Sequence, residues 1–77
     1  MIKVPVNFQQ KEDAVKFVKI VNQYPFQMDL VSGNRIVDAK SLLGTIAISQ
    51  AERLSLQIYS APSPSTEQML AEMQNYL

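Results

Sequence analysis

The chain has no cysteine and no histidine among its 77 residues, and these absences exclude several kinds of site. Without cysteine, no disulfide can stabilise the fold and no thiolate can bind a metal ion. Without histidine, the chain lacks the usual acid–base group at neutral pH and a common metal ligand. No cluster of carboxylates replaces these ligands, so the sequence predicts neither a metal site nor a cofactor.

Glycine is scarce as well, since Gly33 and Gly44 are the only two in the chain. Their spacing fits neither the G-x-G-x-x-G fingerprint of dinucleotide sites nor the Walker loop that binds phosphate.

Long apolar runs are also missing. None approaches the roughly 18 residues of a membrane helix, and the N-terminus lacks the apolar stretch of a signal peptide. We therefore expect a soluble, cytoplasmic protein without membrane insertion.

Neither sign of charge is in excess, because seven Lys and Arg residues balance seven Asp and Glu residues. The sequence shows no basic stripe, which argues against a nucleic-acid partner.

The length of 77 residues is that of one domain, so we expect residues 1–77 to form a single domain. A domain this small buries only about 60–65% of its unfolded surface, which leaves little margin of stability.

Three stretches alternate apolar and polar residues with the period of a half-buried strand, namely residues 2–6, 26–39 and 54–58. The middle stretch is interrupted by Ser32, Gly33 and Asn34. Because glycine and asparagine tolerate the positive φ of a hairpin turn, this stretch predicts two strands. Pro5 has no N–H to donate, so the first strand should lie at a sheet edge or turn that position to solvent.

Three other stretches have the period of a helix. The apolar side of the first is formed by Ala14, Phe17, Val18 and Val21. Pro25 should end this helix, because the residue before a proline avoids helical angles. A short helix should run from Ser41 to about Ile48, and the last helix should begin with a capping box from Ser65 to Gln68. The apolar side of the last helix is expected to consist of Met69, Leu70, Met73 and Leu77.

The predicted order of elements is therefore βαββαβα. This order is typical of an α+β fold, here an open-faced β-sandwich in which a four-stranded antiparallel sheet carries three helices on one face. The other face of the sheet should be solvated, which suits the alternating strands.

Glu12 and Asp13 are adjacent carboxylates near the start of the first helix, and they have two interpretations. They could form an acid–base pair, or they could complement the positive end of the helix dipole. Because adjacent helical residues point about 100° apart, the sequence favours the dipole interpretation. With no other candidate group, composition and spacing predict that the chain is not an enzyme.

The order of elements and residues 38–46 (DAKSLLGTI) resemble the HPr family, and most of all its Gram-positive form. HPr proteins are the histidine-containing phosphocarriers of the bacterial sugar phosphotransferase system. The resemblance covers nearly the whole chain. It implies a bacterial, cytoplasmic relative of the sugar-transport phosphotransferase proteins, with protein partners of the phosphotransferase or catabolite-control type.

The chain departs from this family at the phosphorylation site. HPr carries its phosphoryl group on a histidine in a His-x-Arg-Pro sequence at the start of the first helix. Counting back from Phe17, Gln10 takes the histidine position and Glu12 the arginine position. Asp13 takes the proline position, and Gln9 fits the histidine position equally well because the preceding loop is about one residue shorter.

These replacements remove the chemistry of a carrier. A glutamine amide is no nucleophile at neutral pH, and Glu12 puts a negative charge where a phosphoryl group needs a cation. One branch of the family has glutamine at the histidine position and serves regulation instead of transport, and Gln10 resembles that branch. Glu12 and Asp13 depart even from it.

Ser41 has two interpretations. As an N-cap, its hydroxyl accepts a backbone N–H from the first turn of the short helix. The resemblance implies a second role, because the matching serine of Gram-positive HPr is phosphorylated by a dedicated kinase and then acts in carbon catabolite repression. A helix N-terminus attracts the negative charge of a phosphate, and Lys40 is the neighbouring residue.

The apolar residues after Ser41 also have two interpretations. Thr45, Ala47 and Ile48 are expected to face the sheet. Leu42, Leu43 and Ile46 are either further core residues or an exposed patch. The resemblance implies a patch that, with Val15 and Lys19, docks partner proteins, and a contiguous apolar patch on a small protein marks an interaction site.

Two functional hypotheses follow, beside the possibility that the chain retains only the fold. The favoured one is an HPr-like interaction protein without carrier activity, acting through the surface of the first two helices and switched at Ser41 by a serine kinase. The alternative is a residual phosphoryl-transfer component of the phosphotransferase system that uses an acceptor other than histidine.

Overall fold

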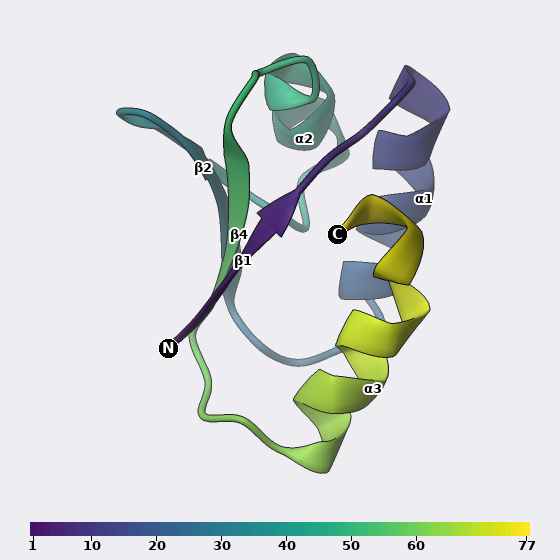
Figure 1. The fold of residues 1–77 in the computed structure, drawn as a ribbon, viewed down its shortest axis with the longest axis vertical. Coiled ribbons are helices and arrows are strands. Elements are labelled where there is room, and N and C mark those ends of the chain that lie inside the picture. The colour runs from purple at the N-terminus through teal and green to yellow at the C-terminus, as the bar shows by residue number, and fades with distance from the viewer.

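The computed structural model describes residues 1–77, and its elements follow the predicted order. The strands are β1 (Ile2–Val6), β2 (Met28–Ser32), β3 (Arg35–Asp38) and β4 (Leu54–Ile58). The helices are α1 (Lys11–Val21), α2 (Leu42–Ile48) and α3 (Pro64–Glu72), and a 3₁₀-helix, η1 (Gln74–Tyr76), ends the chain. Figure 1 shows α1 and α3 along one side of the sheet, with α2 near one end. None of the helices combines the length and hydrophobicity that crossing a membrane requires.

The strands form one antiparallel sheet in the order β1-β4-β2-β3. The sequence predicted that the strand with Pro5 lies at an edge or turns this position to solvent, and both hold, because β1 pairs only with β4 and Pro5 is exposed. The predicted hairpin is also confirmed: β2 and β3 are joined through Gly33, whose φ of 61° is one that residues with a side chain rarely adopt.

One face of the sheet is buried and the other is open, as the alternation predicts. A row of paired residues crosses the inner face and consists of Val4, Leu56, Leu30 and Val37. Its two central members are fully buried, and α1 and α2 contribute Phe17 and Ile48 to the same core. The positions between these core residues alternate to the open face, where no side chain of the four strands is buried.

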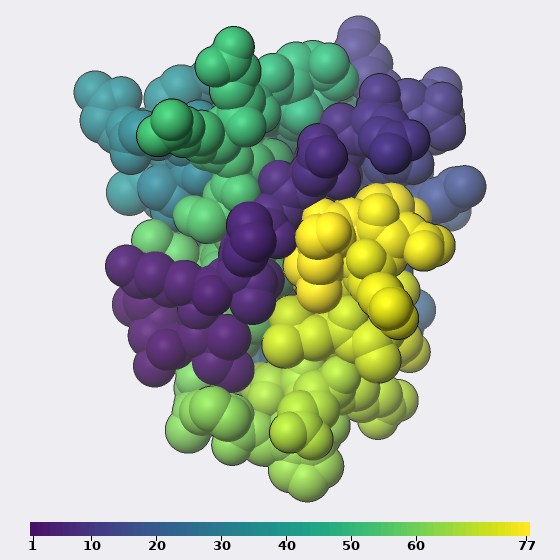
Figure 2. Space-filling model, viewed as in Figure 1, coloured from purple at the N-terminus to yellow at the C-terminus, as the bar shows by residue number.

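The C-terminus is held against the loop between β1 and α1. The N–H of Asn7 donates a 2.7 Å hydrogen bond to the carbonyl oxygen of Tyr76. The ring of Tyr76 packs with Phe8 and Phe17, at centroid distances of 6.0 and 6.4 Å. Figure 2 shows the last residues, in yellow, lying against the N-terminal strand, in purple. The prediction that Leu77 belongs to the apolar side of the last helix is therefore wrong, because Tyr76 fills that place and Leu77 is exposed.

The capping box predicted from Ser65 to Gln68 is wrong by two residues. Ser63 is the N-cap of α3, and its hydroxyl accepts the N–H of Thr66 at 3.2 Å. The hydroxyl of Thr66 in turn accepts the N–H of Ser63 at 2.8 Å. Pro64 fixes this start, because its ring sets the φ of the first helical residue and the helix needs no N–H there.

The first helix ends at Val21, earlier than the position of Pro25 predicts. The side-chain amide of Asn22 donates to the carbonyl of Val18 at 2.9 Å and to that of Lys40 at 3.1 Å. This side chain therefore adds a second donor to the carbonyl of Val18, which also accepts the backbone N–H of Asn22, and it ties the end of α1 to the segment that leads into α2.

Tyr24 joins the ends of α1 and α3, since its hydroxyl donates a 2.6 Å hydrogen bond to Glu72. This bond, together with desolvation and the charge of Glu72, raises the pKa of Tyr24 to about 12. Because the folded state holds the proton more tightly than an unfolded tyrosine, the resulting stabilisation is complete below about pH 10 and is lost as the pH rises through about 12.

We expect Glu72→Gln to lower the pKa of Tyr24, because the charged acceptor of its proton is removed. Tyrosinate absorbance measured during an alkaline titration tests this. The matched control is Asp29→Asn, which should lower the pKa of Tyr59 instead, since Asp29 accepts the hydroxyl of Tyr59 and raises its pKa. A Glu72→Gln titration curve that superposes on that of the wild type would contradict this account of Tyr24.

Candidate functional site

The two positions singled out for phosphate chemistry lie at opposite ends of α1. Gln10 is exposed and is the N-cap of this helix. Ser41 lies beside the other end, because the carbonyl of the preceding residue, Lys40, accepts the side-chain amide of Asn22. An α-helix of the 11 residues of α1 is about 16 Å long, so the structure does not bring Gln10 and Ser41 together.

The N-terminus of α1 is occupied by a carboxylate of the chain itself. One oxygen of Asp13 accepts the backbone N–H of Gln9 at 3.0 Å and that of Gln10 at 3.3 Å. These two amides are therefore already paired with an anion, at a helix end where the dipole favours negative charge. The prediction that Asp13 serves the helix start is supported by this geometry, whereas the adjacent Glu12 is exposed.

Sequence reasoning identified the helix dipole here but missed the hydrogen bonds of Asp13. The signal for them was present, because an acidic residue three positions after the N-cap is the second half of a capping box. The spacing from Gln10 to Asp13 has this form. The arrangement occupies the N–H of the N-cap residue, Gln10, which is one of the amides that an α-helix leaves without an intrahelical partner.

Ser41 is the N-cap of α2, as predicted, and its hydroxyl accepts the N–H of Gly44 at 3.0 Å. Gly44 lies in a closely packed place. A Cβ atom at this position would lie 3.2 Å from the hydroxyl oxygen of Ser41 and 3.3 Å from the Cβ of Val37 in β3. The absence of a side chain at Gly44 thus allows the first turn of α2 to lie against both the cap and the sheet.

The neighbouring cation is directed elsewhere. The ammonium of Lys40 donates a 2.7 Å hydrogen bond to the carbonyl oxygen of Tyr24, at the end of α1. Its backbone N–H donates to the carboxylate of Asp38 at 2.9 Å. The sequence placed Lys40 beside Ser41 as a cation for a phosphate, but in the structure its charge holds α1 to the start of α2.

The residues after Ser41 divide between surface and core. Leu42 is 43% exposed and Leu43 is 81% exposed. Ile46 is half-buried and packs against the core, so it is only partly available to a partner. Thr45 and Ile48 are fully buried, as expected, but the expectation for Ala47 is wrong because Ala47 is exposed.

The other two residues expected in this patch belong to α1. Val15 is half-buried and Lys19 is exposed. They lie one turn apart on the same side of the helix. The two helices that carry these residues, α1 and α2, pack against each other and are labelled in Figure 1. We call Val15, Lys19, Leu42, Leu43 and Ile46 the helix surface.

The site offers no chemistry of its own beyond hydrogen bonding and apolar contact. The structure contains no group of three or more acidic, histidine or cysteine side chains that could hold a metal ion. No buried side-chain nitrogen or oxygen lacks a hydrogen-bond partner. Side chains of the chain itself bond to the start of each α-helix, and the exposed leucines are the unusual feature that remains.

This architecture is that of the HPr proteins. The chain is similar to the crystal structure described as HPr-C-His from Thermoanaerobacter tengcongensis, with 21% identity and a TM-score of 0.73. The match covers 97% of this chain and 89% of that one. The predicted α+β open-faced β-sandwich is thereby confirmed.

A second solved structure with this fold is Crh, the catabolite repression containing protein of Bacillus subtilis, which forms an intertwined dimer by domain swapping. The chain is 19% identical to it, with a TM-score of 0.65, and the match covers 97% of this chain and 88% of Crh. No family model and no curated protein matches the sequence. The likeness to both structures therefore concerns the fold.

The hydrogen bonds of Asp13 predict an unequal effect of two neighbouring carboxylates on stability. We expect Asp13→Ala to lower the free energy of unfolding by about 1–2 kcal/mol, because two amides lose their acceptor and the dipole loses an anion. Glu12→Ala is the matched control and should change it by less than about 0.5 kcal/mol. Urea denaturation measures both, and equal losses would show that the hydrogen bonds of Asp13 contribute little.

Proposed function

We propose that the chain is a cytoplasmic, HPr-like interaction protein without phosphocarrier activity, related to the phosphotransferase system and to carbon catabolite control. It acts by binding a partner protein through the helix surface. The observation that carries this proposal is the exposure of Leu42 and Leu43. A protein of 77 residues needs its large apolar side chains for the core, and these two consecutive leucines are not used there.

The start of α1 supports the absence of carrier activity. Gln10 offers no nucleophile, and the carboxylate of Asp13 already accepts the N–H groups of Gln9 and Gln10 at this end of the helix. The exposed carboxylate of Glu12 adds a second negative charge at this end of the helix. An incoming phosphate dianion is therefore repelled at the place where a carrier attracts it.

Ser41 is the proposed point of regulation, with a serine kinase as the second partner. A phosphate on its hydroxyl would bring about −1.5 to −2 charges to the N-terminus of α2, directly beside Leu42. The cap bond to Gly44 would be replaced by bonds from phosphate oxygens to the same first turn. The charge would then change which partner the exposed leucines accept, because a docking site that excludes anions would reject the modified form.

Incubation with phosphoenolpyruvate and the first enzyme of the phosphotransferase system tests the absence of carrier activity. We expect no acid-labile phosphate on the wild-type chain. Gln10→His alone should also remain unphosphorylated, because Glu12 still repels the phosphoryl group, whereas Gln10→His with Glu12→Arg should perform better than either single change. Rapid phosphorylation of the Gln10→His variant, as fast as that of an authentic carrier, would refute the role assigned to Glu12.

The helix surface is tested by separating its effect on binding from its effect on folding. Leu43→Ser should leave the free energy of unfolding within about 0.5 kcal/mol of the wild-type value, because the side chain is already in water. Ile46→Ser should cost more, about 1–2 kcal/mol, because Ile46 packs against the core. Urea denaturation distinguishes the two variants.

The same variants are then used in affinity capture from native lysate, with the bound protein identified by mass spectrometry. We expect Leu43→Ser to lose the partner while Gln50→Ser, an exposed position just after α2, retains it. Undiminished capture by Leu43→Ser would overturn the helix surface as the docking site.

A further inference from the structure

The open face of the sheet carries two rows of side chains that cross all four strands. The strand register aligns Lys3, Gln57, Asp29 and Asp38 in one row, and Pro5, Ser55, Val31 and Ile36 in the next. Directly paired residues of antiparallel strands point to the same face, so each row lies on the side opposite the core. None of these side chains is buried.

The first row has an asymmetric distribution of charge. Lys3 lies on β1, at one edge of the sheet, and Asp38 lies on β3, at the other edge. Asp29 is paired directly with Asp38, and two carboxylates opposite each other in a sheet are destabilising. Their hydrogen-bond donors carry no charge: Asp29 accepts the hydroxyl of Tyr59 at 2.8 Å, and Asp38 accepts the backbone N–H of Lys40 at 2.9 Å.

A two-fold axis parallel to the strands makes this row complementary to itself. Such an axis exchanges the two edges of the sheet, so β1 of one copy lies over β3 of a second copy. Lys3 then faces Asp38 of the second copy, and the side-chain amide of Gln57 faces Asp29. Each contact occurs twice because the interface is isologous. Packed sheets lie about 10 Å apart, a distance that an opposed lysine and aspartate span.

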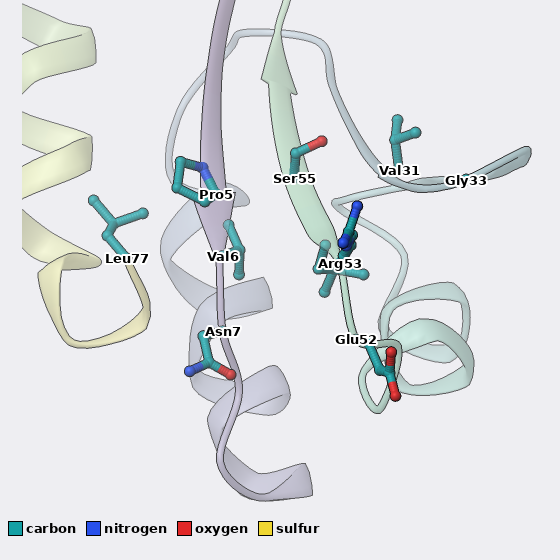
Figure 3. Close-up of a pocket in the computed structure, with 10 residues that line it drawn as sticks. Pro5, Val6, Asn7, Val31, Gly33, Glu52, Arg53, Ser55 and Leu77 are labelled. Atoms are coloured by element: carbon teal, nitrogen blue, oxygen red, sulfur yellow. The ribbon is translucent and has the colours of Figure 1, made fainter.

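The second row fits the same rotation. Ile36 is 64% exposed and projects from β3, and the axis places it over Pro5 of the second copy. Pro5, Ser55 and Val31 line a groove with a volume of about 610 Å³. Figure 3 shows these three residues on neighbouring strands, with Arg53 beside them. A protruding apolar side chain and a groove that receives it are thus related by the operation that pairs the charges.

We propose that the open face of the sheet is a self-association surface on which a second copy of this chain docks, face to face and around a two-fold axis parallel to the strands. Because a four-stranded face is small, the dimer is weak and forms at high local concentration. The helices lie on the opposite side of each sheet, so the dimer presents two helix surfaces outward and can bind two partner sites at once. The self-association is independent of the function proposed above, whereas the binding of two partner sites rests on it.

Sedimentation equilibrium over protein concentrations up to about millimolar tests the proposal. The weight-average mass should rise from 8.7 kDa towards twice that value. Lys3→Asp and Asp38→Lys should each weaken the association by roughly tenfold or more, since each converts two attractive pairs into two repulsive ones. The double variant Lys3→Asp with Asp38→Lys should restore it. Lys16→Asp, an equal change of charge at an exposed position on α1, is the control and should leave it unchanged.

Asp38→Lys also removes the acceptor for the N–H of Lys40, so folding of each variant is checked by circular dichroism. Ile36→Ser breaks no side-chain hydrogen bond and should weaken association by itself. The proposal is overturned if the wild type stays monomeric at every concentration, or if the double variant associates no better than the single ones. A dimer that does not dissociate on dilution and is unaffected by these substitutions also overturns the proposal. Such a dimer would arise from strand exchange instead of contact between the two sheet faces.

Discussion

The structure depends on burying one face of the two central strands, β4 and β2. Leu56 and Leu30 are paired at the centre of this face and are fully buried, and α1 closes over them with Phe17. Because the side chains of a strand alternate, this single requirement fixes which residues of every strand point inward and which remain on the open face. The edge strands extend the same rows, and the helices cover the inner side.

A second constraint, the unpaired backbone groups at helix ends, explains the side chains found at the start of each α-helix. Each of the three helices is capped by the chain's own side chains, through Asp13, Ser41 and Ser63. At the start of α1 the cap is a carboxylate, so the N–H groups of Gln9 and Gln10 are already paired with an anion of the chain itself. The same physical feature that can bind a phosphate thus serves here to stabilise a small fold.

The molecule consequently presents two distinct surfaces on opposite sides. On the helical side, Leu42 and Leu43 project from a helix whose other residues anchor it through Thr45 and Ile48. On the open side of the sheet, charges and an exposed isoleucine are arranged in rows by the strand register. Neither surface carries a group of acidic, histidine or cysteine side chains that could hold a metal ion.

The sequence alone determined the order of elements, the inward positions of the strands, the edge position of β1 and the cap at Ser41. Each of these follows from local periodicity or from the chemistry of one residue, such as the missing N–H of Pro5. Tertiary structure decided the rest. Ala47 is exposed although the pattern assigned it to the core, and Ile46 is half-buried. Tyr76 takes the place expected for Leu77, and Lys40 bonds to Tyr24 across the fold. Periodicity shows which side of an element is apolar, but only the neighbouring elements decide how much of that side is covered and which charged groups meet.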